Sequence, residues 1–573
     1  MPKITYIGAG SAVFARQVIT DILAIDGLDD GEIALVDVDE RRLDLATRLV
    51  DKLVERSGKS YKVHATTQRN DVLAGSDYVV NSIEVAGLQN VRHDYDIPLT
   101  YGVDQCIGDT IGPGGIFKAL RTGPAWLDIC RDIQRACPHA TVLNFTNPMS
   151  ILTLAALRAT DLQVVGLCHS VQGTSGQLAR YLGVPYPELT WECAGINHNA
   201  WFTKLERDGE DMYPLLRERA RDSDVYEQDP VRFETMLHLG YFVTESSGHF
   251  SEYVPWFRKR PELIQRYTRA GYKGESGFYA NNWPTWRAKS DEWIEDLIAG
   301  RREIPSTRSS EYAADIVEAK ELNRPKVIYG NVRNESLVDN LPDGCVEVAC
   351  LVDRRGVQPC RFGPLPEQCA AMNRSHMAVH ELVVRALLDR DREAARHALM
   401  LDPLTAAVCS LQEIGSMFDE MWTAQEDFLA AYWNLPVGMV KIASQADTGG
   451  GRWKSTGRFS RWSPTARSPS SRASGSWKPF GTQPSPRSNS SLRPASMFRG
   501  PRSSARSAGR SPPTPRPGSS TGRAACARRG PVAPSTRSCA SPRRASLPTT
   551  SARCRRCSKM CRSTRSCRCP RWA

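Results

Sequence analysis

Near its start the chain reads Lys3-Ile4-Thr5-Tyr6-Ile7-Gly8-Ala9-Gly10-Ser11, which carries the clearest signal of the fold. Its short apolar run leads into a glycine turn, after which apolar residues recur at helical spacing over residues 18–23. A second apolar run, Ile33-Ala34-Leu35-Val36, ends on Asp37. Strand, glycine turn, helix, strand and acid in this order predict a dinucleotide-binding βαβ unit.

The turn residues and the acid have distinct expected roles in such a unit. Gly8, Ala9, Gly10 and Ser11 would let the backbone approach a pyrophosphate at the N-terminus of the helix. Asp37 would accept hydrogen bonds from ribose hydroxyls, which favours NAD over NADP because the acid repels the extra phosphate. The plainer alternative is a structural turn with a capping Asp.

Further strands follow along the first third of the chain. The buried-strand candidates are Asp77–Ile83, Ala140–Phe145 and Gln163–Leu167, and helical segments separate them. Strands alternating with helices predict a parallel sheet covered on both faces. We therefore expect an α/β fold, with a Rossmann-type doubly wound NAD-binding domain over residues 1–195.

The next part of the chain is richer in helical patterns. Met377–Leu388 and Ala406–Leu429 are the clearest helical segments, and Pro325–Tyr329 and Val346–Val352 have the pattern of strands. This mixture predicts an α+β catalytic and substrate domain over residues 196–447, packed on the first domain.

The last part, residues 448–573, has a different composition. From Gly451 onward there are 28 Lys or Arg and no Asp or Glu, whereas the first 450 residues carry 47 basic and 63 acidic groups. The net charge of +12 therefore comes from the tail and does not mark the body as a nucleic-acid binder. The Arg, Ser and Pro content predicts a disordered tail. Translation in a wrong reading frame is our first explanation for it, and a basic arm for nucleic acid is the alternative.

The sequence also predicts where the protein works. The strand at Lys3–Ile7 leaves no room for a signal peptide, and no apolar run reaches the length of a membrane span. The ten cysteines of the body have no spacing typical of a disulfide scaffold, which favours reduced thiols. We expect a cytoplasmic protein.

Several polar residues follow predicted strands and would face the ligand crevice at the carboxyl edge of the sheet. Cys168 and His169 follow one strand, and Cys168 is placed to offer a thiolate to a metal or to act as a nucleophile. His198 comes 30 residues later and is a candidate second ligand of an open, catalytic metal site. From spacing alone, simple packing is the alternative for this pair.

Two further segments carry candidate residues. Asp109 lies in a glycine-dense loop, Gly108–Gly115, where it is an acid, a metal ligand or a turn residue. Asn147 follows a strand and would face the ligand crevice; the alternative is that it only starts a turn, as Asn-Pro pairs often do. The aromatic-rich segment Gly248–Phe257 is typical of a sugar site or of a core.

Taken together, these motifs resemble glycoside hydrolase family 4. The match extends to about residue 445, and Cys-His-Ser-Val resembles the α-galactosidase branch. The motifs, in chain order, are Gly8-Ala9-Gly10-Ser11, Gly108-Asp109-Thr110-Ile111-Gly112-Pro113-Gly114-Gly115, Asn144-Phe145-Thr146-Asn147-Pro148, Cys168-His169-Ser170-Val171, Ile196-Asn197-His198-Asn199, Asn331-Val332-Arg333-Asn334 and Asn340-Leu341-Pro342.

The resemblance implies an unusual glycosidase mechanism, since NAD-dependent members of this family depart from the two-carboxylate scheme. Bound NAD oxidises the sugar at C3, a base removes the C2 proton, the aglycone is eliminated, water adds, and the hydride returns. A divalent metal, typically Mn, holds the C2 and C3 oxygens. The resemblance implies Cys168 and His198 as the metal ligands and Tyr253 as the C2 base.

The same resemblance implies the remaining roles and the partners. Asp109 would be the acid that assists aglycone departure, and Asn147 and His169 would contact substrate hydroxyls. The substrate would be a small α-glycoside, and the protein a homodimer or homotetramer. No membrane partner and no specific nucleic acid are expected.

Three alternatives stay open at this point. Within the family, the chain could be an α-glucosidase or an α-galacturonidase. Outside it, an NAD dehydrogenase of the lactate or malate type shares the domain plan, although we find no His–Asp relay and carboxylate-binding Arg placed as those enzymes have them. The third alternative is a nucleic-acid-binding protein that uses the basic tail.

Overall fold

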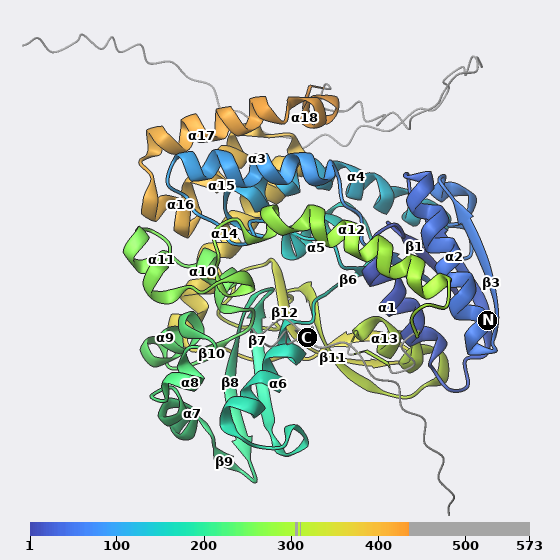
Figure 1. The fold of residues 1–573 in the computed structure, drawn as a ribbon, viewed down its shortest axis with the longest axis horizontal. Helices are drawn as coiled ribbons and strands as arrows, with labels where there is room; N and C mark the ends of the chain where they lie inside the picture. The colour runs from blue at the N-terminus through green and yellow to red at the C-terminus, as the bar shows by residue number, and fades with distance from the viewer. Residues whose placement is uncertain (304–307, 310, 435–573) are drawn as a thin grey trace, which may run out of the picture. The chain divides into compact units, whose positions relative to one another are not determined.

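The computed structural model describes residues 1–303, 308–309 and 311–434 (Figure 1). These residues belong to one compact unit. The predicted disordered tail, residues 448–573, lies outside the described residues. One sheet of 13 strands runs through the described part of the chain, and helices pack on it.

Six parallel strands form the first half of the sheet, in the order β3-β2-β1-β4-β5-β6. This is the doubly wound order, in which the direction of winding reverses between β1 and β4. It confirms the predicted Rossmann-type fold. The strands are β1 (Lys3–Ile7), β2 (Asp30–Val36), β3 (Ser60–Thr66), β4 (Tyr78–Asn81), β5 (Thr141–Asn144) and β6 (Gln163–Leu167).

The connecting helices follow from local sequence signals, as α2 (Glu40–Ser57) shows. It begins at Asp39, whose side chain accepts a hydrogen bond from the Arg42 N–H, and it ends at Gly58 in the left-handed conformation. Its apolar positions bury one face against the sheet. The other helices of this half are α1 (Ala12–Leu23), α3 (Gly87–Thr100), α4 (Gly112–Ala136) and α5 (Met149–Ala159).

The second half of the chain extends the same sheet with antiparallel strands. β11 (Lys326–Arg333) pairs with β6, and β12 (Cys345–Asp353) pairs with β11. The predicted strands near Pro325–Tyr329 and Val346–Val352 are thus confirmed. The sheet continues through β7 (Thr190–Ile196), β8 (Asn199–Arg207) and β10 (Phe242–Val243), while β9 (Glu210–Asp211) and β13 (Gly356–Pro359) pair at the side.

The register of these strands brings distant segments to one level of the sheet. Gly166 of β6 pairs with Asn331, which pairs with Glu347, which in turn pairs with Gly195 of β7. The chain that follows β6 therefore lies near the turn between β7 and β8. The predicted domain boundary at residue 195 falls inside this shared sheet.

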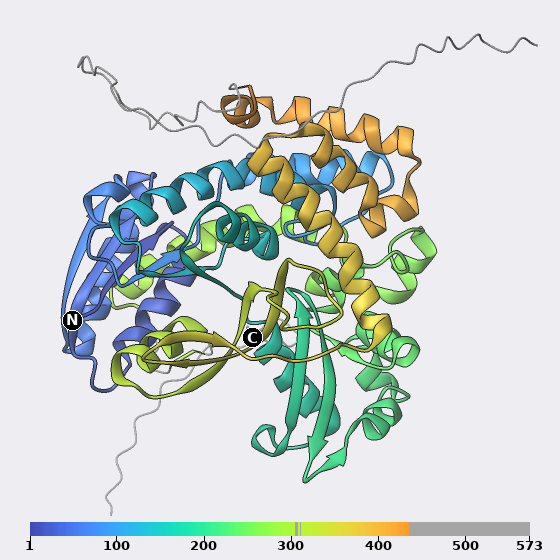
Figure 2. The same cartoon turned by 180° about the vertical axis from the view of Figure 1, so that it is seen from behind.

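Thirteen further helices surround the sheet in the described part of the chain. The gold helix α14 (Figure 2) contacts β7 and β8 of the sheet. The helices are α6 (Ser170–Leu182), α7 (Tyr213–Arg219), α8 (Ser223–Tyr226), α9 (Pro230–Leu239), α10 (Ser247–Tyr253), α11 (Pro261–Tyr267), α12 (Phe278–Ile298), α13 (Tyr312–Leu322), α14 (Glu367–Asp389), α15 (Arg392–Leu401), α16 (Pro403–Val408), α17 (Leu411–Ala424) and α18 (Glu426–Trp433).

One sequence prediction needs correction in this region. The segment Ala406–Leu429 is not one helix, because it is divided among α16, α17 and α18. α17 begins at Ser410, whose side chain forms a capping box with Glu413 and so starts a new helix. The apolar periodicity continues across the break and hides it from a reading of the sequence.

Candidate active site

The predicted cofactor residues lie where β1 meets β2. Gly8 and Ala9 donate backbone hydrogen bonds to the carbonyl oxygen of Val36 at 2.9 and 3.1 Å, and Gly10 N donates to Asp37 Oδ2 at 2.7 Å. A Cβ at Gly10 would lie 2.7 Å from that same carboxylate oxygen, so only glycine allows the acid to approach the turn. Ser11 ends the turn and stands at the N-cap of α1.

This arrangement fits a dinucleotide. An acid at the end of the second strand, a glycine turn at the end of the first, and a helix that starts there together form the set of groups that binds a ribose and a pyrophosphate. The turn also lies at the reversal between β1 and β4, which is where ligands bind in open α/β sheets.

The predicted metal ligands converge from separate segments. Cys168 follows β6 and His198 lies in the β7–β8 turn, and Cys168 Sγ is 3.3 Å from His198 Nε2. His198 has a φ of 63°, a left-handed backbone that residues with a Cβ rarely adopt. The site therefore holds the imidazole in an unusual backbone conformation, as functional sites often do.

Tyr253 completes this cluster from α10. Its Oη is 3.3 Å from His198 Nδ1, so the imidazole contacts the thiol with one nitrogen and the phenol with the other. Tyr253 is buried, and burial together with the charge of Glu245 and Asp109 raises the pKa of the phenol well above its usual value. The phenol carries its proton in this state.

Glu245 also reaches His198, although nothing in the sequence singled it out. Its Oε2 is 3.4 Å from His198 Nε2, and its φ is 72°. Burial alone would raise the pKa of this carboxyl, but His198 and His249 outweigh burial and lower the pKa to about 2. Glu245 follows the short strand β10 in the sequence Thr-Glu-Ser-Ser, which has no motif; only the tertiary fold reveals it.

A second cluster surrounds Asp109. Asn147 Nδ2 donates to Asp109 Oδ2 at 3.3 Å, and Lys118 Nζ lies 3.6 Å from the same oxygen. Burial raises the pKa of Asp109, but the charges of Lys118 and His249 outweigh it and lower the pKa to about 2. Asp109 is thus a carboxylate and a hydrogen-bond acceptor in this state.

The glycines near Asp109 have a packing role. A Cβ at Gly114 would lie 2.2 Å from the carbonyl oxygen of Gly108, and one at Gly115 would lie 2.4 Å from the backbone of Thr110. The loop folds back on the first turn of α4, which is why it is dense in glycine. This fold holds Asp109 above the start of α4.

His249 of α10 joins the two clusters. Its Nε2 is 3.9 Å from Asp109 Oδ1, and its ring centroid is 4.9 Å from that of His198. On its other side Nδ1 lies 3.0 Å from Glu252, whose carboxylate also accepts the Gly108 N–H at 3.1 Å. Burial lowers the pKa of His249, yet the paired Glu252 outweighs burial and raises it.

The site is also continuous with the glycine turn. Ser82, which follows β4, donates to the carbonyl oxygen of Gly8 at 3.2 Å. Two residues later Glu84 pairs with Lys118 at 2.9 Å, and Lys118 reaches Asp109. The end of β4 therefore connects the dinucleotide turn to the Asp109 cluster.

His169 stands at the edge of the site. Its side chain is 59% exposed, and its Nδ1 lies 3.6 Å from Glu311 Oε1. It stands at the N-cap position of α6, next to Cys168, without a side-chain capping hydrogen bond. His169 is thus a predicted site residue that is exposed to solvent and adjacent in sequence to Cys168.

The buried amides beside His198 are further signs of a ligand site. Asn197 and Asn199 are buried, and both amide side chains lack a hydrogen-bond partner among the described residues. Buried polar groups are normally satisfied, so such groups call for an explanation. Sugar hydroxyls are donors and acceptors that suit amide groups.

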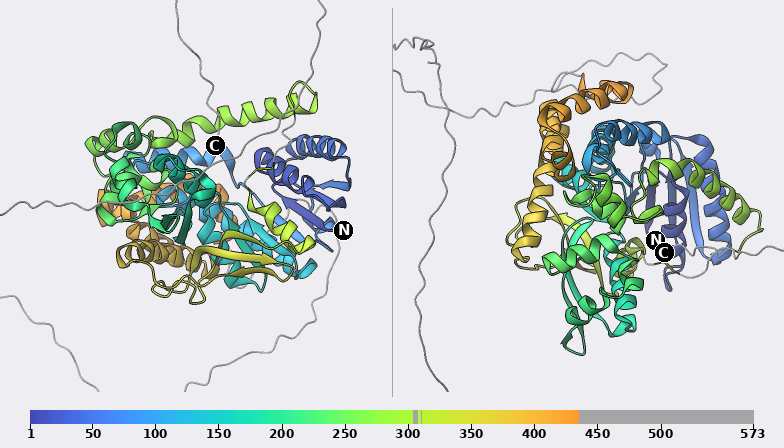
Figure 3. Two further views of the ribbon diagram at one scale, coloured as in Figure 1. Left: turned by 90° about the horizontal axis from the view of Figure 1, so that it is seen from below. Right: turned by 60° about the vertical axis from the view of Figure 1, so that its left-hand side comes forward.

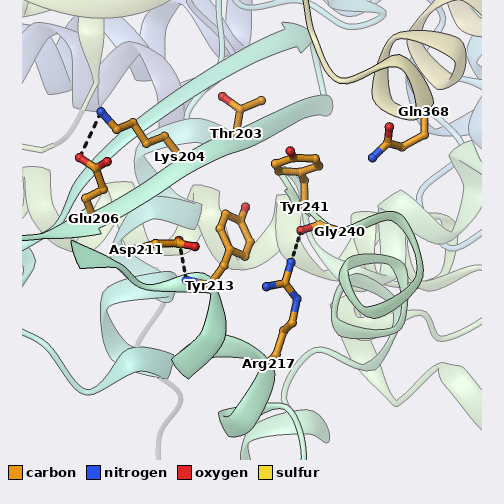
Figure 4. Close-up of a pocket in the computed structure, with 9 residues that line it drawn as sticks. All are labelled: Thr203, Lys204, Glu206, Asp211, Tyr213, Arg217, Gly240, Tyr241 and Gln368. Carbon is orange, nitrogen blue, oxygen red and sulfur yellow. Dashed lines mark hydrogen bonds and ion pairs between the residues drawn. The ribbon is translucent and has the colours of Figure 1, made fainter. Parts of the chain in front are cut away.

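A pocket elsewhere on the molecule contains none of the predicted residues (Figure 4). It lies between β8, α7 and the chain around Gly240. Lys204 pairs there with Glu206 at 3.1 Å, and Arg217 donates to the carbonyl oxygen of Gly240 at 3.1 Å. Its cations are thus engaged by the wall of the pocket.

Comparisons with known proteins agree with the geometry. The profile of the family 4 glycosyl hydrolases matches residues 3–184, and that of the family 4 glycosyl hydrolase C-terminal domain matches residues 193–405. The chain belongs to glycosyl hydrolase family 4. It is a glycoside hydrolase, which confirms the predicted family and removes the dehydrogenase and nucleic-acid-binding alternatives as its main function.

Curated relatives narrow the comparison. An α-galactosidase of Bacillus subtilis is 40% identical, over 75% of this chain and 100% of the relative. An α-galactosidase of Rhizobium meliloti is 36% identical, over 80% of this chain and 95% of the relative. An α-galacturonidase of Bacillus subtilis is 30% identical, over 70% of this chain and 93% of the relative.

Solved structures share the fold. A Bacillus subtilis protein described as a glucosidase, lplD, has a TM-score of 0.66 at 27% identity, over 74% of this chain and 99% of its own. The 6-phospho-β-glucosidase of Thermotoga maritima, crystallised with manganese, NAD+ and glucose 6-phosphate, has a TM-score of 0.61 at 22% identity, over 74% of this chain and 99% of its own.

Two structural findings bear on the other predictions. Among the described residues, no helix is both long enough and apolar enough to cross a membrane. The ten described cysteines are all free thiols.

Proposed function

We propose that this member of the family hydrolyses α-galactosides, with NAD held at Gly8–Ser11 and Asp37 and a divalent metal, Mn²⁺ by preference, held by Cys168 and His198. The observation that carries the proposal is the pair of contacts at His198, whose ring meets Cys168 Sγ with one nitrogen and Tyr253 Oη with the other. The α-galactosidases of Bacillus subtilis and Rhizobium meliloti support the substrate, and the complex of the Thermotoga maritima enzyme supports the cofactors.

The donor set fits an open metal site. In the ranges that the structure describes, no group of three or more His, Cys, Asp or Glu side chains is arranged to hold a metal ion. Cys168 and His198 therefore offer two donors, which leaves coordination positions for sugar oxygens and water. When bound, NAD supplies a reversible hydride acceptor and the metal supplies a Lewis acid.

The tautomer of His198 sets the role of Tyr253. If Nε2 of His198 binds a cation, the ring proton must be on Nδ1. Nδ1–H then points at Tyr253 Oη, which becomes the acceptor of this hydrogen bond rather than its donor. A phenol oxygen that accepts a hydrogen bond beside positive charge has a lower pKa, and this prepares Tyr253 to remove the C2 proton.

Asp109 and its neighbours would bind and orient the sugar. Asn147 and Lys118 both contact the Asp109 carboxylate, so the three present donors and an acceptor to sugar hydroxyls at one place. The low pKa of Asp109 means that it must gain a proton before it can act as the acid for the aglycone. Exposed His169 is placed to contact the outer part of the substrate.

The charges of the site favour a neutral sugar. Asp109, Glu245 and Glu311 are carboxylates near the predicted ligands, and Lys118 already pairs with Glu84 and Asp109. A galacturonoside would bring another negative charge into these surroundings, at an electrostatic cost. This supports the α-galactoside over the α-galacturonoside, whereas an α-glucoside differs only in the orientation of a hydroxyl.

A panel of nitrophenyl α-glycosides tests the proposal, with NAD, Mn²⁺ and thiol each omitted in turn. We expect release of nitrophenol from the α-galactoside, with loss of activity when NAD is removed or the metal is chelated. Full activity of the chelated, NAD-free protein would overturn the mechanism. Faster cleavage of the α-glucoside or α-galacturonide would reassign the substrate and leave the mechanism intact.

Location and assembly complete the proposal. A thiolate metal ligand needs reducing surroundings, because oxidised Cys cannot bind the metal. This supports a cytoplasmic protein, as does the free state of the ten described cysteines. We also keep the homodimer or homotetramer implied by the family resemblance, which a measurement of mass in solution checks directly.

A further inference from the structure

Helix α12 lies along the first two helices of the dinucleotide-binding half (Figures 1 and 3). Two ion pairs fix it to α2: Arg42 Nη2 is 3.1 Å from Asp291 Oδ2, and Arg48 Nη2 is 2.7 Å from Glu295 Oε1. Arg16 of α1 lies 4.3 Å above the centre of the Trp293 ring. The register of α12 against the cofactor domain is therefore defined by side-chain contacts.

That register places a third residue beyond the end of α2. Asp291 and Glu295 are four residues apart, so they lie on one face of the helix, and Arg287 is the next residue of this row. α2 begins after its N-cap, Asp39. The row of Glu295, Asp291 and Arg287 therefore extends beyond the N-terminus of α2, toward the β2–α2 connection that contains Asp37.

The contacts of Arg42 show what lies at that end. Besides Asp291, the Arg42 guanidinium donates to the carbonyl oxygen of Gly10 at 2.7 Å. Gly10 in turn donates to Asp37. Arg287 stands one helical turn from Asp291, on the side of the glycine turn and the ribose-binding acid.

Arg287 itself is in the state expected of a ligand-binding group. It is half-buried, yet in the described part of the chain it makes no hydrogen bond and no ion pair within 4 Å. Burial lowers the pKa of its guanidinium, Arg42 lowers it further, and the more distant charges of Asp291, Asp39 and Asp37 act against this. Arg42 and Arg48 on α2, in contrast, are each paired with a residue of α12.

We propose that Arg287 is a cofactor-binding residue, which lies with its guanidinium on the adenine ring of the dinucleotide. This rests on the proposed use of NAD. Asp37 marks the position of the adenosine ribose, and the adenine lies beside that ribose. A planar guanidinium packs on aromatic faces, and a weakly hydrated Arg suits such a half-buried position better than a Lys.

Calorimetric titration of the full chain tests this with three ligands: NAD, ADP-ribose, which contains the adenosine part, and nicotinamide mononucleotide, which lacks it. For Arg287→Ala we expect the Kd of NAD and of ADP-ribose to rise by about tenfold, as for loss of a cation–π contact. The Kd of the mononucleotide should not change. Lys289→Ala is the matched control, because it removes an exposed cation two residues away on the same helix.

The outcomes separate this inference from the proposed function. Wild-type affinity for NAD in Arg287→Ala, with a circular dichroism spectrum like that of the wild type, would mean that Arg287 has no cofactor role. A larger loss for NADP than for NAD would instead make Arg287 a ligand of the 2′-phosphate and overturn the adenine contact. Failure of the wild-type chain to bind NAD would refute the proposed function together with this inference.

Discussion

The two ends of the active site are built in different ways. The dinucleotide end uses the backbone of one turn and one acid, all within the first two strands of the sheet. The sugar end uses side chains from the ends of β5 and β6, the β7–β8 turn and α10. The first is local in sequence and the second depends on long-range pairing.

The two ends are therefore sensitive to different substitutions. At the dinucleotide end a single added methyl group displaces the acid, because the backbone itself forms the site. At the sugar end the site is formed by side chains from separate segments, so a change of one side chain removes one chemical group and leaves the glycine turn in place. A substitution at one end is expected to leave the other end intact.

The largest effect is expected for Cys168→Ser. A hydroxyl is a far poorer ligand than a thiolate for a divalent metal, so we expect kcat/KM to fall by about 10³-fold. NAD affinity should stay within a factor of about two, because Cys168 is three strands from β1. Activity assays with Mn²⁺ titration and calorimetry with NAD measure the two quantities.

The matched control for this variant is Cys360→Ser, which replaces an exposed cysteine outside the site. It should keep the wild-type kcat/KM and the wild-type affinity for NAD. An unchanged Mn²⁺ dependence in Cys168→Ser would show that this cysteine only packs, and the metal would then need other ligands.

Tyr253→Phe is expected to have the next largest effect. Removal of the Oη leaves the fold and His198 in place but removes the proposed base, and loss of a general base typically costs about 10²- to 10³-fold in kcat. Exchange of the C2 proton with solvent deuterium, followed by NMR, should stop together with turnover. Exchange at the wild-type rate would transfer the role to His249.

Asp109→Asn should affect substrates unequally. If Asp109 becomes the acid, its loss matters most for poor leaving groups, so kcat/KM should fall about 100-fold for an alkyl galactoside and much less for a nitrophenyl galactoside. Asn keeps the size of the side chain next to Asn147 and Lys118. Equal losses for both substrates would mean that Asp109 only binds and orients the sugar.

The sequence predicted the dinucleotide end more completely than the sugar end, for a physical reason. Gly8, Gly10 and Asp37 act through strand order and turn geometry, which short-range patterns encode. Glu245 and Lys118 act through contacts with His198 and Asp109 that form only in the tertiary fold, and no local pattern marks them. Cys168 and His198 were singled out by family motifs, because such motifs record long-range pairing, and their role as metal ligands stays a prediction.

The break at Ser410 shows the same limit for secondary structure. Apolar periodicity indicates which side of a helix is buried. The periodicity can continue across a break when two consecutive helices both bury an apolar face. The capping box of Ser410 and Glu413 was present in the sequence as Ser-x-x-Glu, so this boundary could have been predicted from the capping pattern.

Gly10→Ala tests the dinucleotide end. Its Cβ would lie 2.6 Å from Arg42 Cβ and 2.7 Å from Asp37 Oδ2, so the acid and Arg42 must move. Overpacking of this kind costs about 1–3 kcal/mol, and we expect NAD affinity to fall by up to about 100-fold. Mn²⁺ affinity should not change.

Gly173→Ala is the matched control, because a Cβ there meets nothing within 4 Å. It should bind NAD as the wild type does. If Gly10→Ala also lost Mn²⁺ affinity, the two ends would be coupled through the contacts of Ser82, Glu84 and Lys118, and they would not act independently.

The smallest effect concerns a buried acid beneath the sugar end. Asp402 caps α16, where its Oδ2 accepts hydrogen bonds from the backbone and hydroxyl of Thr405 at 2.9 and 2.6 Å. Its Oδ1 is buried with no partner among the described residues. Burial raises the pKa of Asp402 to about 6 from the usual 3.8, against the lowering effect of Thr405 and the Gly112 backbone.

The sign of the pH effect follows from this shift. Between pH 4 and 6 the unfolded chain has lost the proton of Asp402 while the folded chain still holds it, so this group makes the folded state less stable as the pH rises, by up to about 3 kcal/mol. Asp402→Asn keeps the cap and cannot ionise. Because the new amide N–H groups of Asp402→Asn are buried as well, we expect a net gain in unfolding free energy at pH 7 of about 1–2 kcal/mol.

The control is Asp391→Asn, at the more exposed cap of α15, which should show no gain in unfolding free energy. Urea unfolding at pH 5 and pH 7 measures the difference, and the gain of Asp402→Asn should be larger at pH 7. An equal gain in unfolding free energy at both pH values would mean that the side chain of Asp402 is already ionised in the folded protein at pH 5.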